Sequence, residues 1–199
     1  HIWTGGDEGV YMSRSIDSGE SWEQTSIRIS PIEVISTTFP QVDAGDPGRI
    51  AITYLGSENS SELGEPDIDG ENWTGNAHYA TTNVSYHLYI TLSLNALDPS
   101  PTFYTYRVTD DPVQIGSICL NSGDCRDIGG SNRNLLDFND LHIDREGRVF
   151  VAFADGCTDS CASDSNSTAE DSRSRRGSVY FLGSGPSLYD SVGLMEMPF

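Results

Sequence analysis

The sequence predicts an all-β protein, and three observations support this prediction. Apolar and polar residues alternate over short runs such as Arg49–Tyr54, Phe103–Val108 and Arg148–Phe153, which is the two-residue period of a β-strand. Gly, Asp, Asn and Pro residues punctuate these runs, as they do in turns. No stretch of three helical turns has apolar residues at the spacing of an amphipathic helix.

An internal repeat predicts two of the strand pairs. Val42–Tyr54 reads VDAGDPGRIAITY and Leu141–Phe153 reads LHIDREGRVFVAF, so the Gly-Arg pairs at 48–49 and 147–148 align, and the apolar positions after them match one for one. A tight turn between two alternating segments is typical of a β-hairpin. We therefore expect a strand, a turn and a second strand in each copy.

A second alignment predicts another hairpin in the same unit. Tyr11–Trp22 (YMSRSIDSGESW) aligns with Tyr89–Phe103 (YITLSLNALDPSPTF), which places Asn95 at the position of Asp17 and inserts three residues before the aromatic residue. Together the alignments define a unit of four strands, A to D. The first alignment supplies strands A and B, and the second supplies strands C and D.

The chain then contains parts of three such units. Residues 1–37 hold the C–D end of one unit, and residues 38–109 hold a complete unit with a long B–C insertion. Residues 110–199 hold a cysteine-bearing loop and the A–B–C start of another unit. We treat the whole chain as one partial domain, because a repeat unit buries its apolar faces only against its neighbours.

The hairpin at residues 15–22 carries a motif. Ser15, Asp17, Gly19 and Trp22 fit the pattern S-x-D-x-G-x-x-W. Aspartate can accept hydrogen bonds from backbone amides in a turn, glycine can adopt a positive φ, and tryptophan can cover the apolar side of the hairpin. The motif resembles the Asp-box, or bacterial neuraminidase repeat, of sialidase-like β-propellers.

This resemblance implies that each unit is a four-stranded antiparallel blade of a propeller and that the Asp-box is a folding motif, not an active site. The copy at Asn95 departs from the pattern, since it lacks the equivalent glycine. A closed propeller has at least four blades, and sialidases of this type have six, so about two and a half blades would leave open sheet edges. We expect the missing blades to come from a longer parent chain or from a partner.

The charge excludes two classes of partner. Thirty acidic residues face eleven basic ones, all of them arginine, for a net charge of −19. A nucleic-acid or anionic-membrane surface needs a basic patch, and the longest apolar runs are too short for membrane insertion. The acidity has two interpretations: halophilic adaptation to high salt, which the absence of lysine favours, or an acidic secreted protein with calcium-binding loops.

The cysteines indicate an oxidising compartment. Four of them form two close pairs in polar stretches, Cys119 with Cys125 and Cys157 with Cys161, and an even count there favours disulfides. Zinc binding is the alternative, but the spacing matches no common zinc ribbon and no histidine lies near the second pair. Four cysteines allow three pairings, of which we favour the local one.

Glycosylation sequons support export of the chain. They have the form N-x-S/T and occur in or beside polar stretches, at Asn59, Asn72, Asn83 and Asn166. Together with the disulfides, the sequons predict an extracellular or cell-surface glycoprotein.

Loop lengths predict which end of the sheets carries function. The A–B and C–D turns are short, whereas the B–C connections at about 55–85 and 154–177 and the D–A connection at about 110–137 are long. In an up-and-down sheet, the B–C and D–A connections emerge at the same end. Long loops on a rigid scaffold are where binding sites are usually built; the alternative is a set of disordered, glycosylated acidic loops.

The candidate ligand-binding residues belong to this end of the sheets, and they are Arg126, Arg133, Asp137, Asp140, Glu58 and Asp155. Arg133 could clamp a carboxylate or sugar hydroxyls, and Asp137 or Asp140 could be an acid, a hydroxyl acceptor or a calcium ligand. Alternatively, Arg133 and Asp137 pair with each other and fix the loop. We expect a glycan or another extracellular ligand here.

The catalytic residues of sialidases are not recognisable in this segment. The resemblance would imply three arginines around the substrate carboxylate, a Tyr–Glu nucleophile pair and an aspartate acid/base. Arg49 and Arg148 fall at the A–B turns, at the opposite end, and no Tyr–Glu pair can be assigned. Ligand recognition is therefore the first prediction. An exo-sialidase or other glycoside hydrolase is one alternative, and a structural surface or adhesion protein is another.

A calcium site is predicted at Asp67, Asp69 and Glu71, which are spaced at i, i+2 and i+4. Calcium prefers such oxygen ligands, although the rest of an EF-hand loop is missing. The alternative is a solvated acidic loop.

The acidic excess leads to a testable prediction. The melting temperature should rise as NaCl is increased from low to molar concentration, because salt screens the repulsion within a chain of net charge −19. If an acidic loop binds calcium, a chelator at constant ionic strength should lower the melting temperature, because a bound ion stabilises the folded state. Differential scanning fluorimetry measures both effects. A flat response to both treatments would show that the acidic residues only make the surface soluble.

Overall fold

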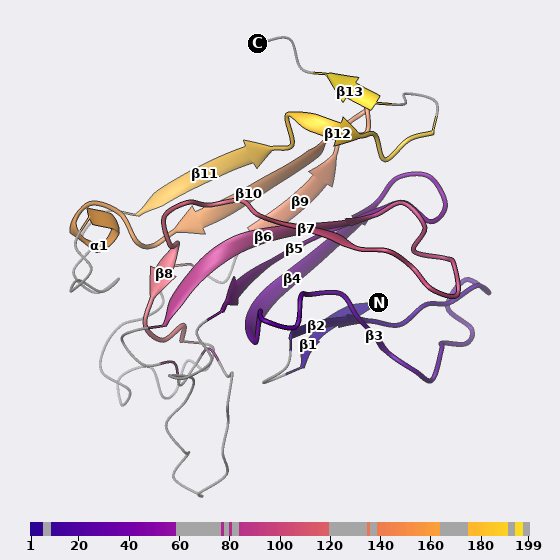
Figure 1. Ribbon diagram of the computed structural model, residues 1–199, viewed down its shortest axis with the longest axis horizontal. Helices are drawn as coiled ribbons and strands as arrows, with labels where there is room; N and C mark the ends of the chain where they lie inside the picture. Colours follow the sequence, from indigo (N-terminus) through magenta and orange to yellow (C-terminus); the bar gives the residue numbers. More distant parts are fainter. Residues whose placement is uncertain are drawn as a thin grey trace, which may run out of the picture.

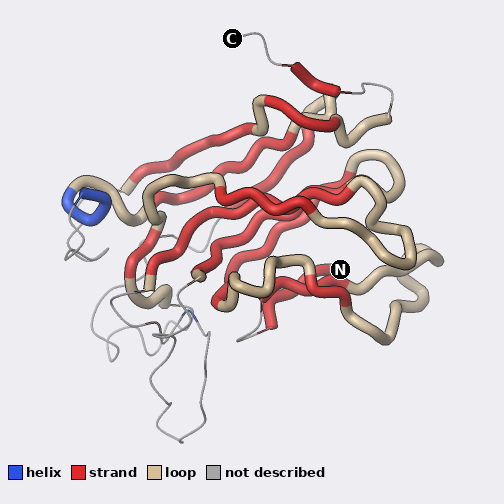
Figure 2. The backbone as a smooth tube through the Cα atoms, in the orientation of Figure 1, coloured by secondary structure: helices blue, strands red, loops and turns tan. Residues whose placement is uncertain are grey.

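The computed structural model describes residues 1–5, 9–58, 77, 80, 84–119, 135, 139–163, 175–190 and 194–196. These residues form antiparallel β-sheets and one short helix, α1 (Ser160–Ser163), which confirms the all-β prediction. Figures 1 and 2 show that the sheets follow one another in space in the order of the sequence. Within the described ranges, none of the helices is both long enough and apolar enough to cross a membrane.

The strands form three main sheets. Their bounds are β1 (Ile2–Gly5), β2 (Gly9–Met12), β3 (Ile27–Arg28), β4 (Ser36–Ala44), β5 (Ile50–Ser57), β6 (Ser85–Ser93), β7 (Tyr104–Arg107), β8 (Gln114–Ile115), β9 (Asn139–Ile143), β10 (Val149–Asp155), β11 (Arg176–Phe181), β12 (Ser184–Pro186) and β13 (Leu194–Glu196). The first sheet has the order β1–β2–β3, the central sheet β4–β5–β6–β7 and the third sheet β9–β10–β11. In addition, β8 pairs with β6, and β12 pairs with β13.

Both hairpins predicted from the internal repeat are present. In the central sheet, β4 and β5 pair with Val42 opposite Ile52. In the third sheet, β9 and β10 pair with Leu141 opposite Val151. The central sheet is an up-and-down arrangement of four strands, which correspond to strands A to D of the predicted unit, and β9 to β11 correspond to strands A to C.

The first sheet has one strand more than the C–D hairpin predicted within residues 1–37. β1 pairs with β2, so that Trp3 lies opposite Tyr11. The sequence around His1 reads as a strand region, but its pairing was not predicted, because the repeat alignment starts at Tyr11.

The two inner strands of the central sheet, β5 and β6, are buried on both faces. An apolar cluster that includes Val10 and Tyr54 fills the space between the first and central sheets. A second cluster, which includes Ile90 and Val151, fills the space between the central and third sheets. Since each fully buried aliphatic or aromatic side chain contributes about 1.5–3 kcal/mol, these two interfaces hold the three sheets together.

The two A–B turns are built alike. Gly48 and Gly147 have φ values of +85° and +77°, which favour glycine over other residues. The Gly48 carbonyl accepts a hydrogen bond from Ala96 N at 2.7 Å, and the Gly147 carbonyl accepts one from Leu188 N at 3.1 Å. Leu188 therefore has the same place in the third sheet as Ala96 has in the central sheet.

Each of the two C–D turns has a side-chain acceptor at the same position, Asp17 in one turn and Asn95 in the other. Asp17 Oδ1 accepts hydrogen bonds from Ser21 N at 2.9 Å and from Ser15 Oγ at 2.7 Å. Hydrogen bonds lower the pKa of Asp17 to about 2. The bond from the Ser21 hydroxyl has the largest effect, and those from Ser21 N and the Ser15 hydroxyl add to it. In the other turn, Asn95 Oδ1 accepts from Thr102 N at 2.9 Å. Ser21 and Thr102 both precede the aromatic residue, so the acceptor has the same role in both turns despite the insertion.

The segment after β12 ties the third sheet to the central sheet at the turn end. Arg49 donates a hydrogen bond to the Ser187 carbonyl at 2.8 Å and forms an ion pair with Asp190. Asp46 N donates to the Leu188 carbonyl at 2.9 Å. These contacts join residues that are about 140 positions apart in the sequence.

Gly147→Ala should lower the free energy of unfolding by about 1–3 kcal/mol, the range for a residue held in a disfavoured backbone conformation. The added Cβ would lie 2.0 Å from Ser187 Oγ and 2.8 Å from Leu188 N, at a φ that disfavours any side chain. Urea denaturation followed by circular dichroism measures the loss.

Gly177→Ala in β11 is the matched control, because no described atom lies within 4 Å of its Cβ position. This variant should be as stable as the wild type or slightly more stable, since alanine restricts the unfolded chain. An equal loss of unfolding free energy in both variants would show that the β9–β10 turn does not require glycine at position 147.

Candidate binding site at the loop-rich end

The described ends of the long connections lie at one end of the sheets, as the loop lengths predict. β5 stops and β6 starts there, with Gly56 opposite His87, and β10 stops and β11 starts there, with Asp155 opposite Arg176. Figure 1 shows these ends on the left and the β4–β5 and β9–β10 turns on the right. We name the left-hand end the loop-rich end.

A short segment bridges the central and third sheets at the loop-rich end. Val113 N donates to the Tyr86 carbonyl at 2.8 Å, and Gly156 N donates to the Val113 carbonyl at 2.9 Å. The ends of β6 and β10 are therefore held at a fixed separation. The central and third sheets are thus joined through Val113 at the loop-rich end.

Only part of the predicted site lies within the described residues. Asp140, Glu58 and Asp155 are described, whereas Arg126, Arg133 and Asp137 lie outside the described residues. Also outside are the predicted calcium ligands Asp67, Asp69 and Glu71, the sequons at Asn59, Asn72, Asn83 and Asn166, and Cys125. Among the side chains that the structure places, no group of three or more His, Cys, Asp or Glu could hold a metal ion.

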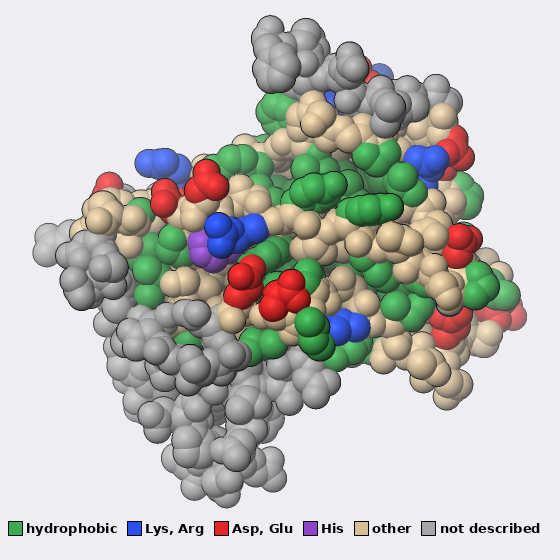
Figure 3. Space-filling model, viewed as in Figure 1, with side chains coloured by type: hydrophobic (Ala, Val, Ile, Leu, Met, Phe, Trp, Pro, Cys, Tyr) green, Lys and Arg blue, Asp and Glu red, His purple; other side chains and the backbone are tan. Residues whose placement is uncertain are grey.

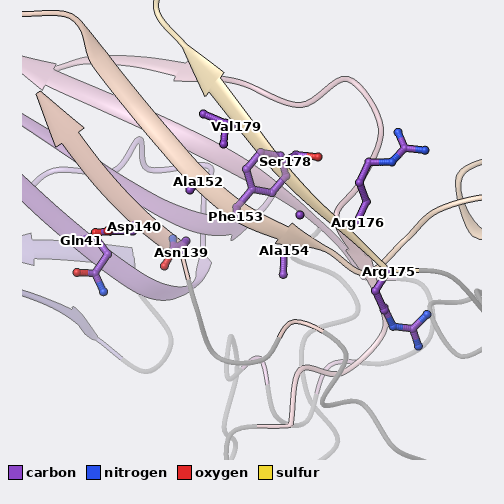
Figure 4. A pocket seen from close by; sticks show the side chains of 11 residues that line it. Gln41, Asn139, Asp140, Ala152, Phe153, Ala154, Arg175, Arg176, Ser178 and Val179 are labelled. Atoms are coloured by element: carbon purple, nitrogen blue, oxygen red, sulfur yellow. The ribbon is translucent and has the colours of Figure 1, made fainter. Parts of the chain in front are cut away.

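A cavity of about 720 Å³ opens on the third sheet toward the loop-rich end. Its polar lining comes from several strands and comprises Gln41, Asn139, Asp140, Arg175, Arg176 and Ser178. Phe153 and Val179 contribute apolar surface. Figure 4 shows Gln41, Asn139 and Asp140 gathered on one side, with the two arginines across Phe153 and Ala154 from them. Asp140, which the sequence analysis named as a candidate ligand-binding residue, therefore lines this cavity.

Asn139 is the most informative side chain of this cavity. It is only 8% exposed, and neither its Oδ1 nor its Nδ2 has a hydrogen-bond partner among the described residues. A buried amide left without partners costs about 1–3 kcal/mol. Both amide atoms are themselves buried, so a ligand or water would reach the one acceptor and two donors of this amide only after a local rearrangement.

Asp155 follows the lining residue Ala154 along β10, although it does not itself line the cavity. Burial raises the pKa of Asp155, and a nearby Asp111 adds to the increase. A 3.0 Å hydrogen bond from Cys157 N and the charge of Arg176 oppose it to a smaller extent. Asp155 is therefore more readily protonated than an ordinary surface aspartate.

A disulfide anchors the chain just after Asp155. Cys157 and Cys161 are bonded and buried, and Ile115 packs against them. This confirms the predicted local pairing and excludes zinc at this pair. Cys119 is also disulfide-bonded, while its predicted partner Cys125 lies outside the described residues.

Predicted residue Glu58 lies in a second, smaller cleft of about 140 Å³. Tyr89 donates its hydroxyl hydrogen bond to Glu58 Oε1 at 2.7 Å, and His87 and Arg107 line the same cleft. Figure 3 shows histidine, cationic and acidic side chains gathered on this face of the molecule. The structure thus brings together a Tyr–Glu pair that the sequence analysis could not assign.

This Tyr–Glu pair does not have the properties of a nucleophile. Burial, and then the hydrogen bond and charge of Glu58, raise the pKa of Tyr89, whereas an activated tyrosine needs a lowered one. The Tyr89 ring also stacks on Tyr54 with their ring centroids 5.5 Å apart, within the core between the first and central sheets. Its role is structural.

Sequence reasoning missed Gln41, Asn139, Arg175 and Arg176. One signal was available for Gln41, since extending the repeat alignment by one position before Val42 and Leu141 pairs Gln41 with Asp140. Burial of Asn139 follows only from packing between sheets. No protein-family model, characterised protein or solved structure matches this chain.

Asn139→Leu should raise the free energy of unfolding of the unliganded protein by about 1–3 kcal/mol, because it removes an unpaired buried amide and adds apolar volume. Urea denaturation measures the change. Gln114→Leu is the matched control, because Gln114 is fully buried but its Nε2 donates to the Ser117 carbonyl at 2.8 Å. Gln114→Leu should destabilise the protein. A comparable loss in the two variants would show that Asn139 is paired in solution.

Proposed function

We propose that the chain is a segment of an extracellular, sialidase-like β-propeller that binds a glycan in the cavity lined by Gln41, Asn139, Asp140 and Arg176. The polar lining of this cavity, with the unpaired amide of Asn139 buried behind it, is the observation that carries this proposal. It lies at the end of the sheets where the long connections meet, which is where a propeller builds its sites on loops.

Several features support the propeller architecture. The central sheet has four up-and-down strands, and its neighbours pack on both of its faces. The A strands of neighbouring sheets lie side by side, since Asp43 Oδ2 of β4 accepts a hydrogen bond from Ile143 N of β9 at 3.0 Å. The shared acceptor at Asp17 and Asn95 agrees with the role of an Asp-box aspartate. Further blades would then come from a longer parent chain or from a partner.

The lining of the cavity suits a carbohydrate. Each sugar hydroxyl both donates and accepts, and the amides of Gln41 and Asn139 and the carboxylate of Asp140 offer both functions. Arg176 can bind a carboxylate or vicinal hydroxyls in a bidentate manner. The methyl groups of Val179, which is 65% exposed, supply apolar contact for the face of a sugar ring. An acidic sugar would use arginine, the only cationic side chain type in this chain.

A glycoside hydrolase is the second candidate, and Asp155 is the observation that favours it. A carboxyl group with a raised pKa can donate a proton to a leaving-group oxygen. Asp155 combines this shift with a place in β10 directly after the cavity-lining residue Ala154. The chain would then supply the acid, and a second carboxylate would have to complete the reaction.

A glycan array followed by titration calorimetry of the best ligand tests the proposal. Asn139→Ala and Arg176→Ala should each weaken binding by roughly 10- to 150-fold, the loss of a paired polar or charged contact. Arg145→Ala is the control, because Arg145 is an exposed arginine in the β9–β10 turn at the opposite end. Unchanged affinity in the cavity variants, or equal loss in the control, would place the site elsewhere.

Asp155→Asn separates the two candidate functions. For a binding protein, this variant should retain affinity and the wild type should release no product from the bound glycan. For a hydrolase, the wild type should release product and Asp155→Asn should lose most of that activity while still binding. Mass spectrometry of the glycan after incubation distinguishes the two results.

A further inference from the structure

The smaller cleft at the loop-rich end is built on one face of the central sheet. Its lining comes from the end of β5, from β6 and from β7, and comprises Ser57, Glu58, Ser85, His87, Tyr89 and Arg107. His87 and Tyr89 are two positions apart in β6, and Arg107 of β7 lies opposite Tyr89. These three side chains therefore project from the same face of the sheet. We name this site the charged cleft.

The charged cleft is on the face of the central sheet that packs on the first sheet. Tyr89 belongs to the apolar cluster between these two sheets, whereas its neighbours Leu88 and Ile90 belong to the cluster between the central and third sheets. The central sheet therefore separates the charged cleft from the cavity that opens on the third sheet. Further sheets of a longer chain would pack on the outer faces of the first and third sheets, which are not the face that carries this cleft.

Two opposite charges line the cleft without neutralising each other. Glu58 directly follows β5 and Arg107 lies in β7, so β6 runs between them. Neither of the two forms an ion pair with any side chain that the structure describes, and both are exposed. The carboxylate and the guanidinium are therefore both accessible to a ligand that enters from solvent.

The side chains of β6 between the two charges are themselves neutral. Tyr89 donates to Glu58 Oε1 at 2.7 Å, and burial, followed by the contact with Glu58, raises the pKa of its phenol. His87 Nδ1 lies 3.0 Å from the Thr109 carbonyl. Burial, followed by the charge of Arg107, lowers the pKa of His87, so its ring is uncharged at neutral pH. The cleft thus presents one negative and one positive group across a neutral polar wall.

This arrangement is complementary to a molecule that carries both charges. An arginine binds a carboxylate through two parallel hydrogen bonds, and a glutamate accepts hydrogen bonds from an ammonium group. A ligand with a single charge would be attracted by one of the two groups and repelled by the other. The cleft volume of about 140 Å³ is below the roughly 300–1,000 Å³ of drug-sized pockets. The ligand must therefore be small, which excludes an oligosaccharide.

We propose that the charged cleft binds a small zwitterionic amino acid, with its ammonium group on Glu58 and its carboxylate on Arg107. The hydrogen bond from Tyr89 holds Glu58 in position for the ammonium group. Because different residues line the two sites, amino-acid binding in the charged cleft does not depend on what the cavity on the third sheet binds.

A probe series on the wild-type chain tests the charge requirement. Glycine, β-alanine and γ-aminobutyrate place the ammonium and carboxylate groups at increasing separation, while acetate and methylammonium each carry only one of them. Titrations followed by NMR chemical shifts of the His87 ring and the Arg107 side chain should saturate with at least one zwitterion. Acetate and methylammonium should bind at least about tenfold more weakly, because each lacks one charged contact. If no zwitterion saturates, or if a singly charged probe binds as tightly, the proposal is wrong.

Charge-neutralising variants test the two named contacts. Glu58→Gln keeps an oxygen that can accept from Tyr89 but removes the negative charge, and Arg107→Gln removes the positive charge. Each should weaken binding of the best zwitterion by about tenfold, the lower end of the range for a charged contact, because both groups are exposed. Circular dichroism shows whether each variant has folded, and the probe series on the wild type needs no variant.

Glu20→Gln and Arg145→Gln are the matched controls. They make the same changes of net charge at exposed positions in turns at the opposite end of the sheets, and they should bind the amino acid as the wild type does. A loss in the controls equal to that in Glu58→Gln and Arg107→Gln would show that net charge, and not the cleft, governs binding, and would contradict the proposal.

The cavity variants distinguish this site from the proposed glycan site. Asn139→Ala and Arg176→Ala should leave amino-acid affinity unchanged, whatever they do to glycan binding. Conversely, Glu58→Gln should leave glycan affinity unchanged. Weaker amino-acid binding in Asn139→Ala or Arg176→Ala would place the amino acid in the cavity on the third sheet and overturn the assignment to the charged cleft.

Discussion

The two-sided burial of the central sheet determines the rest of this structure. β5 and β6 carry apolar side chains on both faces, so the sheet cannot face water on either side. The first and third sheets cover those faces through two separate apolar clusters. Because all three sheets run in parallel layers, their long connections emerge together, and the cavity beside Asn139 forms at that end. The position of the candidate site is thus a consequence of core packing.

A small set of backbone hydrogen bonds at the opposite end keeps the layers in register. A glycine carbonyl at each A–B turn accepts a hydrogen bond from the segment after the C strand, and arginines join the turns of successive sheets. Asp17 and Asn95 accept equivalent backbone hydrogen bonds in their two turns, although only Asp17 is charged. The shape of the turn therefore depends on the acceptor oxygen and tolerates both the loss of charge and the three-residue insertion.

Local patterns predicted the fold better than the site. Alternation and the repeat were sufficient for the hairpins at 42–54 and 141–153, since the two-residue period and the turn glycines are properties of neighbouring residues. They did not predict the pairing of β1 with β2, because the repeat alignment starts only at Tyr11. The Tyr89–Glu58 hydrogen bond joins positions 31 residues apart, and the burial of Asn139 arises from packing between separate sheets. Only Gln41 could have been identified in advance, through its alignment with Asp140.

The segment that follows β12 has a consequence for biosynthesis. Arg49 is translated early, but its partners Ser187 and Asp190 are about 140 residues later in the chain. The first and central sheets can therefore form on the ribosome while the turns at Gly48 and Gly147 are still incomplete. Closing so long a loop is slow, because its entropy is lost before the contact contributes. Until β9 to β11 have been translated, the face of the central sheet that carries Ala51 lacks its covering sheet.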